Sequence, residues 1–391
     1  MRQKKLAGFL ILFLLADITG CQRYGEREKN GEEMQVVKQE ILEDSKEIAK
    51  GCSRIVKQAE KEKAADGFEL QQDVIAYMGL KGYIAVDTEN QIDMVNYEKA
   101  EAFCKAACEG KKAETAIFLV TEAGGFIRYD LRADNGELKV LASSLPPENE
   151  TSREAYFESF TACSWKYTEK GYLFFEQYHK DGFDGAPGQT AIRVKPLDGK
   201  LRRLNQKYVL PAGYRGSRLL AAEWDETDYS ALDFYDLYEV MYVMKYGEDV
   251  PYADEYARIE YEIPEKDFEG VIQTYLNVSG SLLKEQAVYR ADSRTYRYRT
   301  RGLYDSPTPY EPYPEVTGCE EQKDGSLKLT VEAVWARENS DCALVSELMV
   351  RPLKKGRFQY VSNRVVTVSG SIGKSWYTPR LTDEEWERLT D

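Results

Sequence analysis

The chain has 391 residues, is 42% apolar and carries a formal charge of −14 at pH 7. A protein that binds nucleic acid through the phosphates needs clustered Lys and Arg, and this sequence has no long basic run, so nucleic acid is excluded as a partner. The length and apolar content allow a substantial buried core and indicate two domains.

Residues 6–16 form an apolar segment between a basic start and Cys21. Such a segment is too short to span a membrane as a helix and suits the core of a signal peptide. Ile18-Thr-Gly-Cys21 resembles the lipobox of bacterial lipoproteins, in which the cysteine thiol receives a diacylglyceryl group and the preceding peptide is removed. This resemblance implies a signal peptide over residues 1–20, lipidation of Cys21, and anchoring at the outer face of the cell membrane. The alternatives are an ordinary signal peptide or an uncleaved anchor helix that contains a cysteine.

The mature N-terminus is predicted to be a tether followed by a helix. Residues 21–33 are polar and lack periodicity, which predicts a flexible tether. Over residues 34–66, apolar side chains recur at three- and four-residue steps, which indicates an amphipathic helix whose stripe is interrupted by Asp44 and Gly51. We expect this helix to dock on its own domain, because the three clean heptads that a coiled-coil partner requires are missing.

Residues 67–247 are predicted to form an antiparallel β-rich domain. Short alternating apolar runs indicate strands, and the glycine-containing turns between them suit tight hairpins. A helix over Tyr97–Cys108 interrupts the series. No fixed repeat long enough to close a propeller is present, so we favour a twisted sheet or sandwich with packed helices. The predicted strands cover residues 115–120, 126–131, 138–142, 172–178 and 190–194.

Residues 248–369 are predicted to form a second, α+β domain. Pro264 suits the first turn of a helix whose apolar side chains, from Phe268 to Leu276, lie on one face. Strands are expected near residues 287–290, 295–300, 326–335, 343–350 and 358–362. A curved antiparallel sheet wrapped around a helix satisfies this order, so the whole chain is predicted to be α+β, mostly antiparallel β with packed helices. Residues 370–391 form a tail in which Thr382 and Glu385 make a capping box for a short helix.

The runs 263–276, 282–289, 324–334 and 358–363 resemble a family of uncharacterised lipoproteins from gut Clostridia and their relatives. The resemblance covers most of the mature chain. It implies a Gram-positive, membrane-anchored exterior protein of unknown function. It supplies no known activity and no catalytic residues that could be transferred to this chain.

Six cysteines follow Cys21, and we predict that most of them are free and buried. Cys104 and Cys108 share one face of a predicted helix, where both would be small core residues. Cys319 and Cys342 flank a predicted strand and would lie near different ends of it in a simple meander, so a disulfide between them is not expected. Two cysteines without a second pair are a weak indication of a metal, and we predict no metal and no cofactor.

The sequence offers few candidates for catalysis. His179 is the one histidine, and its position at the start of a loop favours a solvated turn residue over a catalytic one. The set Asp87, Asn90 and Asp93 could supply oxygen ligands to calcium but lacks the calcium-loop pattern, so ordinary turn chemistry is the better interpretation. No nucleophile elbow, phosphate loop or dinucleotide motif is present.

Tyrosine is the compositional exception, with 28 residues, about seven per cent of the chain, or roughly twice the usual share. Tyr296 and Tyr298 are predicted to share one face of a strand, opposite Arg297 and Arg299. Prolines stiffen the following loop, and aromatic rings on a stiff loop can stack on sugars or on a partner protein. The candidate ligand-binding residues in this loop are Tyr304, Tyr310 and Tyr313.

The favoured interpretation is a lipid-anchored cell-surface protein without enzymatic activity, a binding or assembly module whose partner is an envelope protein or glycan. The alternative is a hydrolase of cell-wall glycan or peptide that uses a pair of carboxylates. A deep cleft with converging Asp and Glu side chains would favour the enzyme, and a shallow aromatic surface would favour binding.

Overall fold

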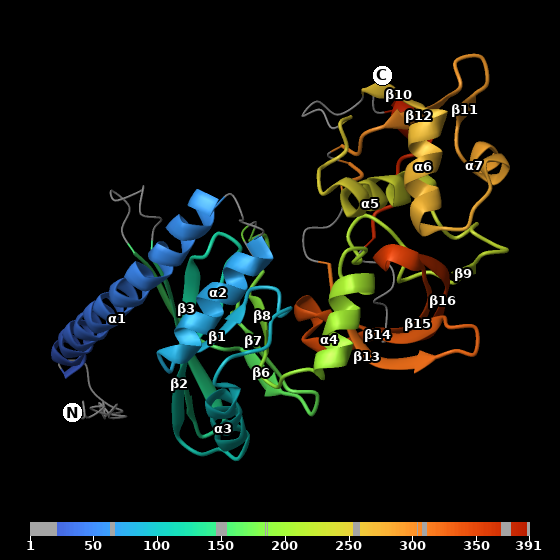
Figure 1. The fold of residues 1–391 in the computed structure, drawn as a ribbon. Coiled ribbons are helices and arrows are strands. Elements are labelled where there is room, and N and C mark those ends of the chain that lie inside the picture. Colours follow the sequence, from blue (N-terminus) through green and yellow to red (C-terminus); the bar gives the residue numbers. More distant parts are fainter. Residues whose placement is uncertain are drawn as a thin grey trace.

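Figure 1 shows the fold as a computed structural model, which describes residues 22–62, 67–145, 155–183, 185, 187–252, 259–302, 304–306, 311–368 and 377–388. These residues form an α+β fold in which most strand pairs are antiparallel, as the sequence predicts. The predicted signal peptide and Cys21 lie outside the described residues. None of the described helices is long and apolar enough to cross a membrane.

The N-terminal half contains a five-stranded sheet covered on both faces (Figure 1). Its helices are α1 (Gln22–Glu62), α2 (Gly67–Leu80) and α3 (Tyr97–Cys108). The sheet contains, in spatial order, β1 (Ile84–Asp87), β2 (Ala113–Val120), β3 (Phe126–Asp134), β4 (Glu137–Ser144) and β5 (Tyr156–Thr161). A second, three-stranded sheet contains β6 (Ser164–Tyr167), β7 (Tyr172–Glu176) and β8 (Gln189–Arg193).

Alternation along β2 explains the two covered faces. Phe118 and Val120 pack in one cluster with α1 and α2, whereas Ile117 and Leu119 pack in another with α3 and the β6–β7–β8 sheet. Strand β1 pairs with β2 in parallel, and the remaining pairs of the five-stranded sheet are antiparallel. The predicted hairpin turn at Gly136 joins β3 to β4 with a φ of +85°, which glycine adopts without steric cost. The predicted strands and the helix over Tyr97–Cys108 are therefore confirmed.

Helix α1 begins at Gln22, so the residues predicted to be a flexible tether are helical. The stretch is rich in Glu, Arg, Lys and Gln, which favour helix without needing an apolar stripe. Further along, the two interruptions of the stripe are docking contacts. Asp44 accepts hydrogen bonds from Arg128 Nη1 at 2.6 Å and Tyr83 Oη at 3.2 Å, and a Cβ at Gly51 would lie 1.9 Å from Tyr77 Oη. The helix docks on its own domain, as predicted.

The C-terminal half contains two sheets and the remaining helices (Figure 1). The smaller sheet has the order β10 (Glu260–Pro264), β12 (Thr295–Arg299) and β11 (Tyr289–Arg290). The larger has the order β13 (Tyr313–Glu321), β14 (Leu327–Trp335), β15 (Ser340–Pro352), β16 (Phe358–Val368) and β9 (Trp224–Asp225). The helices are α4 (Gly199–Leu204), the π-helix η1 (Asn205–Val209), α5 (Phe234–Tyr246), α6 (Glu265–Tyr275), α7 (Gly280–Gln286), the 3₁₀ turns η2 (Ala336–Glu338) and η3 (Lys354–Gly356), and α8 (Asp383–Arg388).

Helix α6 matches the helix predicted from Pro264, and it contacts both sheets. Phe268 stacks on Tyr296 of β12 with 4.3 Å between ring centroids, and Tyr275 packs on Phe358 of β16 at 5.5 Å. The meander after the helix is β13–β16, whose register irregularities are of the kind that bends strands. Strands β11 and β12, which the sequence places with this meander, pair instead with β10 in a separate sheet.

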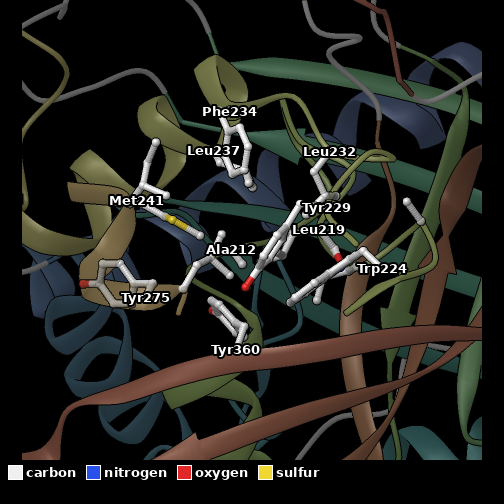
Figure 2. Packing of buried hydrophobic residues seen from close by; sticks show 14 of the residues in the cluster. Ala212, Leu219, Trp224, Tyr229, Leu232, Phe234, Leu237, Met241, Tyr275 and Tyr360 are labelled. Atoms are coloured by element: carbon white, nitrogen blue, oxygen red, sulfur yellow. The ribbon is translucent and has the colours of Figure 1, made fainter. Parts of the chain in front are cut away.

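The buried cores divide the chain earlier than residue 247, where the sequence places the domain boundary. One continuous cluster runs from Tyr208 to Tyr360 and includes α5, which we had assigned to the first domain. Figure 2 shows Phe234, Leu237 and Met241 of α5 packed towards Tyr360 of β16. Helix α5 belongs to the C-terminal half because its apolar side chains complete the core of that half.

The predicted capping box is present at the start of α8. The backbone N–H of Thr382 donates to the Glu385 carboxylate at 2.9 Å, and the N–H of Glu385 donates to Thr382 Oγ1 at 3.3 Å. Trp386 lies next to Arg299, whose guanidinium carbon is 5.5 Å from the indole ring centroid.

Candidate functional site

The structure does not bring the three candidate loop tyrosines together. Tyr304 is 63% exposed, and Tyr310 lies outside the described residues. Tyr313 is half-buried and is the first residue of β13. Its hydroxyl accepts a hydrogen bond from Asn90 Nδ2 at 3.2 Å, and its ring lies 6.4 Å from that of Tyr172. Among the described residues, Tyr304 is therefore the candidate that remains for ligand binding by the loop. Tyr313 instead contributes to packing between the two halves.

The contact between the halves at Tyr313 is polar and buried. Glu315 and Arg193 form an ion pair at 2.5 Å with side chains 4% and 7% exposed, and Tyr172 Oη donates to the same carboxylate at 2.8 Å. Burial raises the pKa of Glu315, although the neighbouring Arg193 acts to lower it. Because removing one partner would leave a buried charge, this cluster is suited to holding the halves together.

Tyr296 and Tyr298 occupy the buried face of β12, as the alternation predicts. Their hydroxyls donate to Glu269 at 2.8 Å and to Glu239 at 2.6 Å. These rings support the core and are not available to a ligand.

The acidic set at Asp87 makes turn contacts. Asp87 accepts the backbone N–H groups of Gln91 at 2.9 Å and Ile92 at 2.8 Å, and Asn90 Nδ2 donates to the carbonyl of Ala191 at 3.0 Å. Asp93 pairs with Arg202 at 2.7 Å. No group of three potential metal-binding side chains occurs among the residues that the structure describes.

The described cysteines are all unpaired. Cys104 is buried, which raises the pKa of its thiol to about 12, but Cys108 is exposed, so the prediction that both are core residues is wrong for Cys108. Cys108 ends α3, where the helix leaves the sheet. Cys319 lies opposite Leu329, whereas Cys342 lies at the other end of β14, between the pairs Ala333–Leu344 and Trp335–Ser340, and this separates them as expected.

The structure assembles an aromatic surface that the sequence analysis did not find. Tyr156 on β5 is 53% exposed, and Tyr178 and Phe183 in the loop after β7 are 70% and 54% exposed. A hydrogen bond between Glu158 of β5 and Gln177, the residue after β7, joins these two segments. We refer to these residues as the Glu158 surface, which consists of Tyr156, Glu158, Gln177, Tyr178, His179 and Phe183.

Hydrogen bonds fix the centre of the Glu158 surface. Tyr156 Oη donates to one carboxylate oxygen of Glu158, and Gln177 Nε2 donates to the other at 2.5 Å. These two bonds, with a smaller contribution from His179, lower the pKa of Glu158 although burial acts to raise it. Burial and Glu158 together raise the pKa of Tyr156 to about 12. At neutral pH the centre is therefore an ionised carboxylate beside a neutral phenol.

A stacked ring pair forms the outer part of this surface. His179 and Phe183 lie 4.0 Å apart between centroids with 6° between their planes. Two glycines allow this packing: a Cβ at Gly185 would lie 2.4 Å from Phe183 Cζ, and one at Gly188 would lie 2.1 Å from the carbonyl oxygen of Gln177. Stacking on His179 thus holds the ring of Phe183 in place while its side chain remains 54% exposed.

The chemistry of the Glu158 surface suits the binding of a ligand. Exposed ring faces stack on apolar faces of a ligand, and the carboxylate and amide accept and donate hydrogen bonds beside them. The sequence contains two signals for it: Tyr156 and Glu158 share one strand face, and Tyr178, His179 and Phe183 crowd a glycine-containing loop. Of these residues only His179 is a candidate from the sequence, because only folding brings Glu158 of β5 next to Gln177.

A model of a protein family matches residues 38–380. The chain belongs to this family, DUF6070, a family of unknown function. Comparison with curated proteins and with solved structures gave no match. The family match ends at Arg380, so α8 lies beyond it, and it begins within α1.

Proposed function

We propose that this DUF6070 protein is a lipid-anchored protein at the outer face of the cell membrane and a non-enzymatic binding module for a glycan of the cell envelope. In this proposal the lipid is attached to Cys21, and the glycan binds to the Glu158 surface. The observation that supports binding is the presence of three exposed aromatic side chains on two segments that the hydrogen-bonded Glu158 and Gln177 join. Rings stack on the C–H faces of sugars, and carboxylates and amides bond their hydroxyl groups.

The carboxylates of the structure support binding over hydrolysis. Of the buried carboxyl groups in the described residues, Asp236 and Glu315 are each paired with an arginine, Arg301 at 2.7 Å and Arg193 at 2.5 Å. Asp87 and Asp305 instead accept hydrogen bonds from backbone N–H groups. A surface hollow on the N-terminal half, between α1 and the sheet, contains no carboxylate. It is lined by Ile41, Leu42, Ser45, Phe126, Ser143, Ser144, Leu145, Ala155 and Phe157.

The binding proposal is tested with the double variant Tyr178→Ala/Phe183→Ala in a co-sedimentation assay on purified cell-wall glycan. Exposed aromatic anchors contribute about 1 to 3 kcal/mol each, so we expect at least a tenfold loss of affinity. Thermal stability should change little, because both side chains are more than half exposed.

The matched control is Tyr304→Ala, which removes an exposed tyrosine from the C-terminal half. Loss of glycan binding in this control, with normal binding in the double variant, would move the site to the predicted loop. Normal glycan binding in both variants would contradict a glycan site at either place.

The anchor is tested separately with Cys21→Ser. We expect the wild-type chain to partition into detergent and to incorporate a labelled fatty acid, and the variant to do neither, because the thiol is the acceptor of the lipid. A wild-type chain that is cleaved elsewhere and remains unlabelled would overturn the anchor without affecting the binding proposal.

A further inference from the structure

The C-terminal segment 377–381 lies against α5 and the end of β12, where one of its side chains enters an acidic pocket. We refer to this pocket as the arginine pocket. Its walls are the carboxylates of Asp236 and Glu239, the rings of Tyr235 and Tyr298, and the backbone carbonyl of Arg299.

Arg380 occupies the arginine pocket, and each nitrogen of its guanidinium group donates a hydrogen bond to a different acceptor. Nε donates to Asp236 Oδ1 at 2.7 Å, Nη1 donates to the carbonyl of Arg299 at 2.8 Å, and Nη2 donates to the carboxylate of Glu239. The guanidinium carbon lies 5.7 Å from the ring centroid of Tyr298 and 5.9 Å from that of Tyr235. The side chain is only 12% exposed.

This set of contacts selects a guanidinium over an ammonium group. Three acceptors lie in three directions around a flat cation, and aromatic rings lie close to it, which matches the planar fork of arginine. A lysine ammonium is a point charge that cannot reach all three acceptors from one position. Without Arg380, Glu239 would lose its ion pair, and the buried Asp236, which is 1% exposed, would be left with one of its two close arginine partners, Arg301.

The pocket also contacts the segment three residues earlier. Tyr377 Oη donates to Asp236 Oδ2 at 2.8 Å. The guanidinium carbons of Arg218 and Arg301 are 5.7 and 5.9 Å from the centroid of the Tyr377 ring. The backbone is bound as well: Arg301 Nη1 donates to the carbonyl of Thr378 at 2.9 Å, and Asp305 Oδ2 accepts the N–H of Leu381 at 3.3 Å. Both side chains and main chain of the segment are therefore recognised.

We propose that the arginine pocket is a peptide-recognition site for an extended segment with tyrosine followed three residues later by arginine, which the C-terminal segment of the chain itself occupies. A partner peptide with the same chemistry can take this place. The recognition differs from a generic tail contact in that it depends on the guanidinium group and on the tyrosine hydroxyl at fixed spacing. The site lies in the C-terminal half and is independent of the Glu158 surface.

The test uses the full chain with the double substitution Tyr377→Ala/Arg380→Ala, which removes both recognised side chains of the segment, and the acetylated and amidated peptide Tyr-Thr-Pro-Arg-Leu as the probe. We expect calorimetry to detect binding of the peptide to the variant and not to the wild-type chain, whose pocket is occupied. The same peptide with lysine in place of arginine should bind at least about tenfold more weakly, and so should the peptide with phenylalanine in place of tyrosine. The matched control is Arg388→Ala, which removes an arginine of α8 whose Nε donates to the carbonyl of Glu384 in the same helix and should leave the pocket occupied.

Equal binding of the arginine and lysine peptides, or no binding of either to the folded double variant, would overturn the proposal. If the double variant does not fold, Arg380→Lys keeps the positive charge and serves in its place. In that variant the arginine peptide should displace the lysine side chain and raise the melting temperature, while the lysine peptide should not. Absence of this difference would equally overturn the proposal.

Discussion

The tyrosines of this chain fall into two regions that use the same hydrogen bond for different purposes. In the buried cluster around β12, Tyr296 donates to the carboxylate of Glu269, and its ring is fully buried against Phe268. On the Glu158 surface, Tyr156 donates to the carboxylate of Glu158, and its side chain is 53% exposed. In both regions a phenol is paired with a carboxylate, and what differs is whether anything covers the ring.

This difference has an electrostatic counterpart. Burial raises the pKa of Tyr296 far above the ordinary value of tyrosine, whereas the pKa of Tyr156 is raised only to about 12. A hydroxyl–carboxylate pair therefore does not by itself identify a functional tyrosine. The exposed ring face does, because only an uncovered face has contact area to offer a ligand.

The strongest test of this comparison removes a covered ring. We expect Tyr296→Ala to lower the free energy of unfolding by about 3 to 5 kcal/mol, since the loss of a buried aromatic side chain leaves a cavity. Urea denaturation followed by circular dichroism measures this change. Tyr178→Ala, which removes a 70% exposed ring, is the control and should stay within about 0.5 kcal/mol. Similar losses of unfolding free energy in the two variants would contradict the division into covered rings that stabilise the fold and exposed rings that do not.

A smaller loss of stability is expected from a substitution at Tyr313. The sequence places this residue on the predicted binding loop, whereas the structure places it between the two halves. Tyr313→Phe keeps the ring and removes the hydroxyl that Asn90 donates to. We expect a loss of about 0.5 to 1.5 kcal/mol in unfolding free energy, the usual contribution of one hydrogen bond, and unchanged glycan binding. Weaker glycan binding without any loss of stability would return Tyr313 to the ligand site.

The smallest expected effect is a dependence of binding on pH. The pKa of Glu158 is lowered in the folded protein, so its carboxylate stays ionised through the range in which ordinary glutamates titrate. Its contribution to stability is present above the ordinary pKa of about 4.3 and is lost as the pH falls through the lower folded value. Glycan affinity should therefore be constant from pH 7 to about 5 and fall only below the ordinary value. Glu158→Gln should remove this fall, and a fall that persists in it would assign the titration to another group.

The local elements of the fold could be predicted because their signals lie within a few residues of each other. Helix α3 was predicted with both of its ends, and α6 with its buried residues, from apolar spacing. The capping box of α8 likewise involves residues only three positions apart, Thr382 and Glu385. Strand β13 was missed, because its first residues, Tyr313-Pro-Glu, resemble the end of the proline-rich loop before it.

The candidate sites could be predicted only in part, because their partners lie far apart in the sequence. Asp44 and Gly51 interrupt the apolar stripe of α1. Nothing near them in the sequence indicates that they contact Arg128 and Tyr77 in the fold. The same holds for Glu158 with Gln177, and for Arg380 with Asp236.

The sequence by itself determined the α+β class, most helices and strands, and the face of each that is apolar, because periodicity reports which side of an element avoids water. The tertiary structure alone decided which polar and aromatic side chains are covered. Tyr296, Tyr313 and Tyr156 are chemically identical, and their exposure depends on which distant element packs over them. That packing also closed the arginine pocket around Arg380, by bringing the C-terminal segment beside a helix that lies more than a hundred residues earlier in the chain.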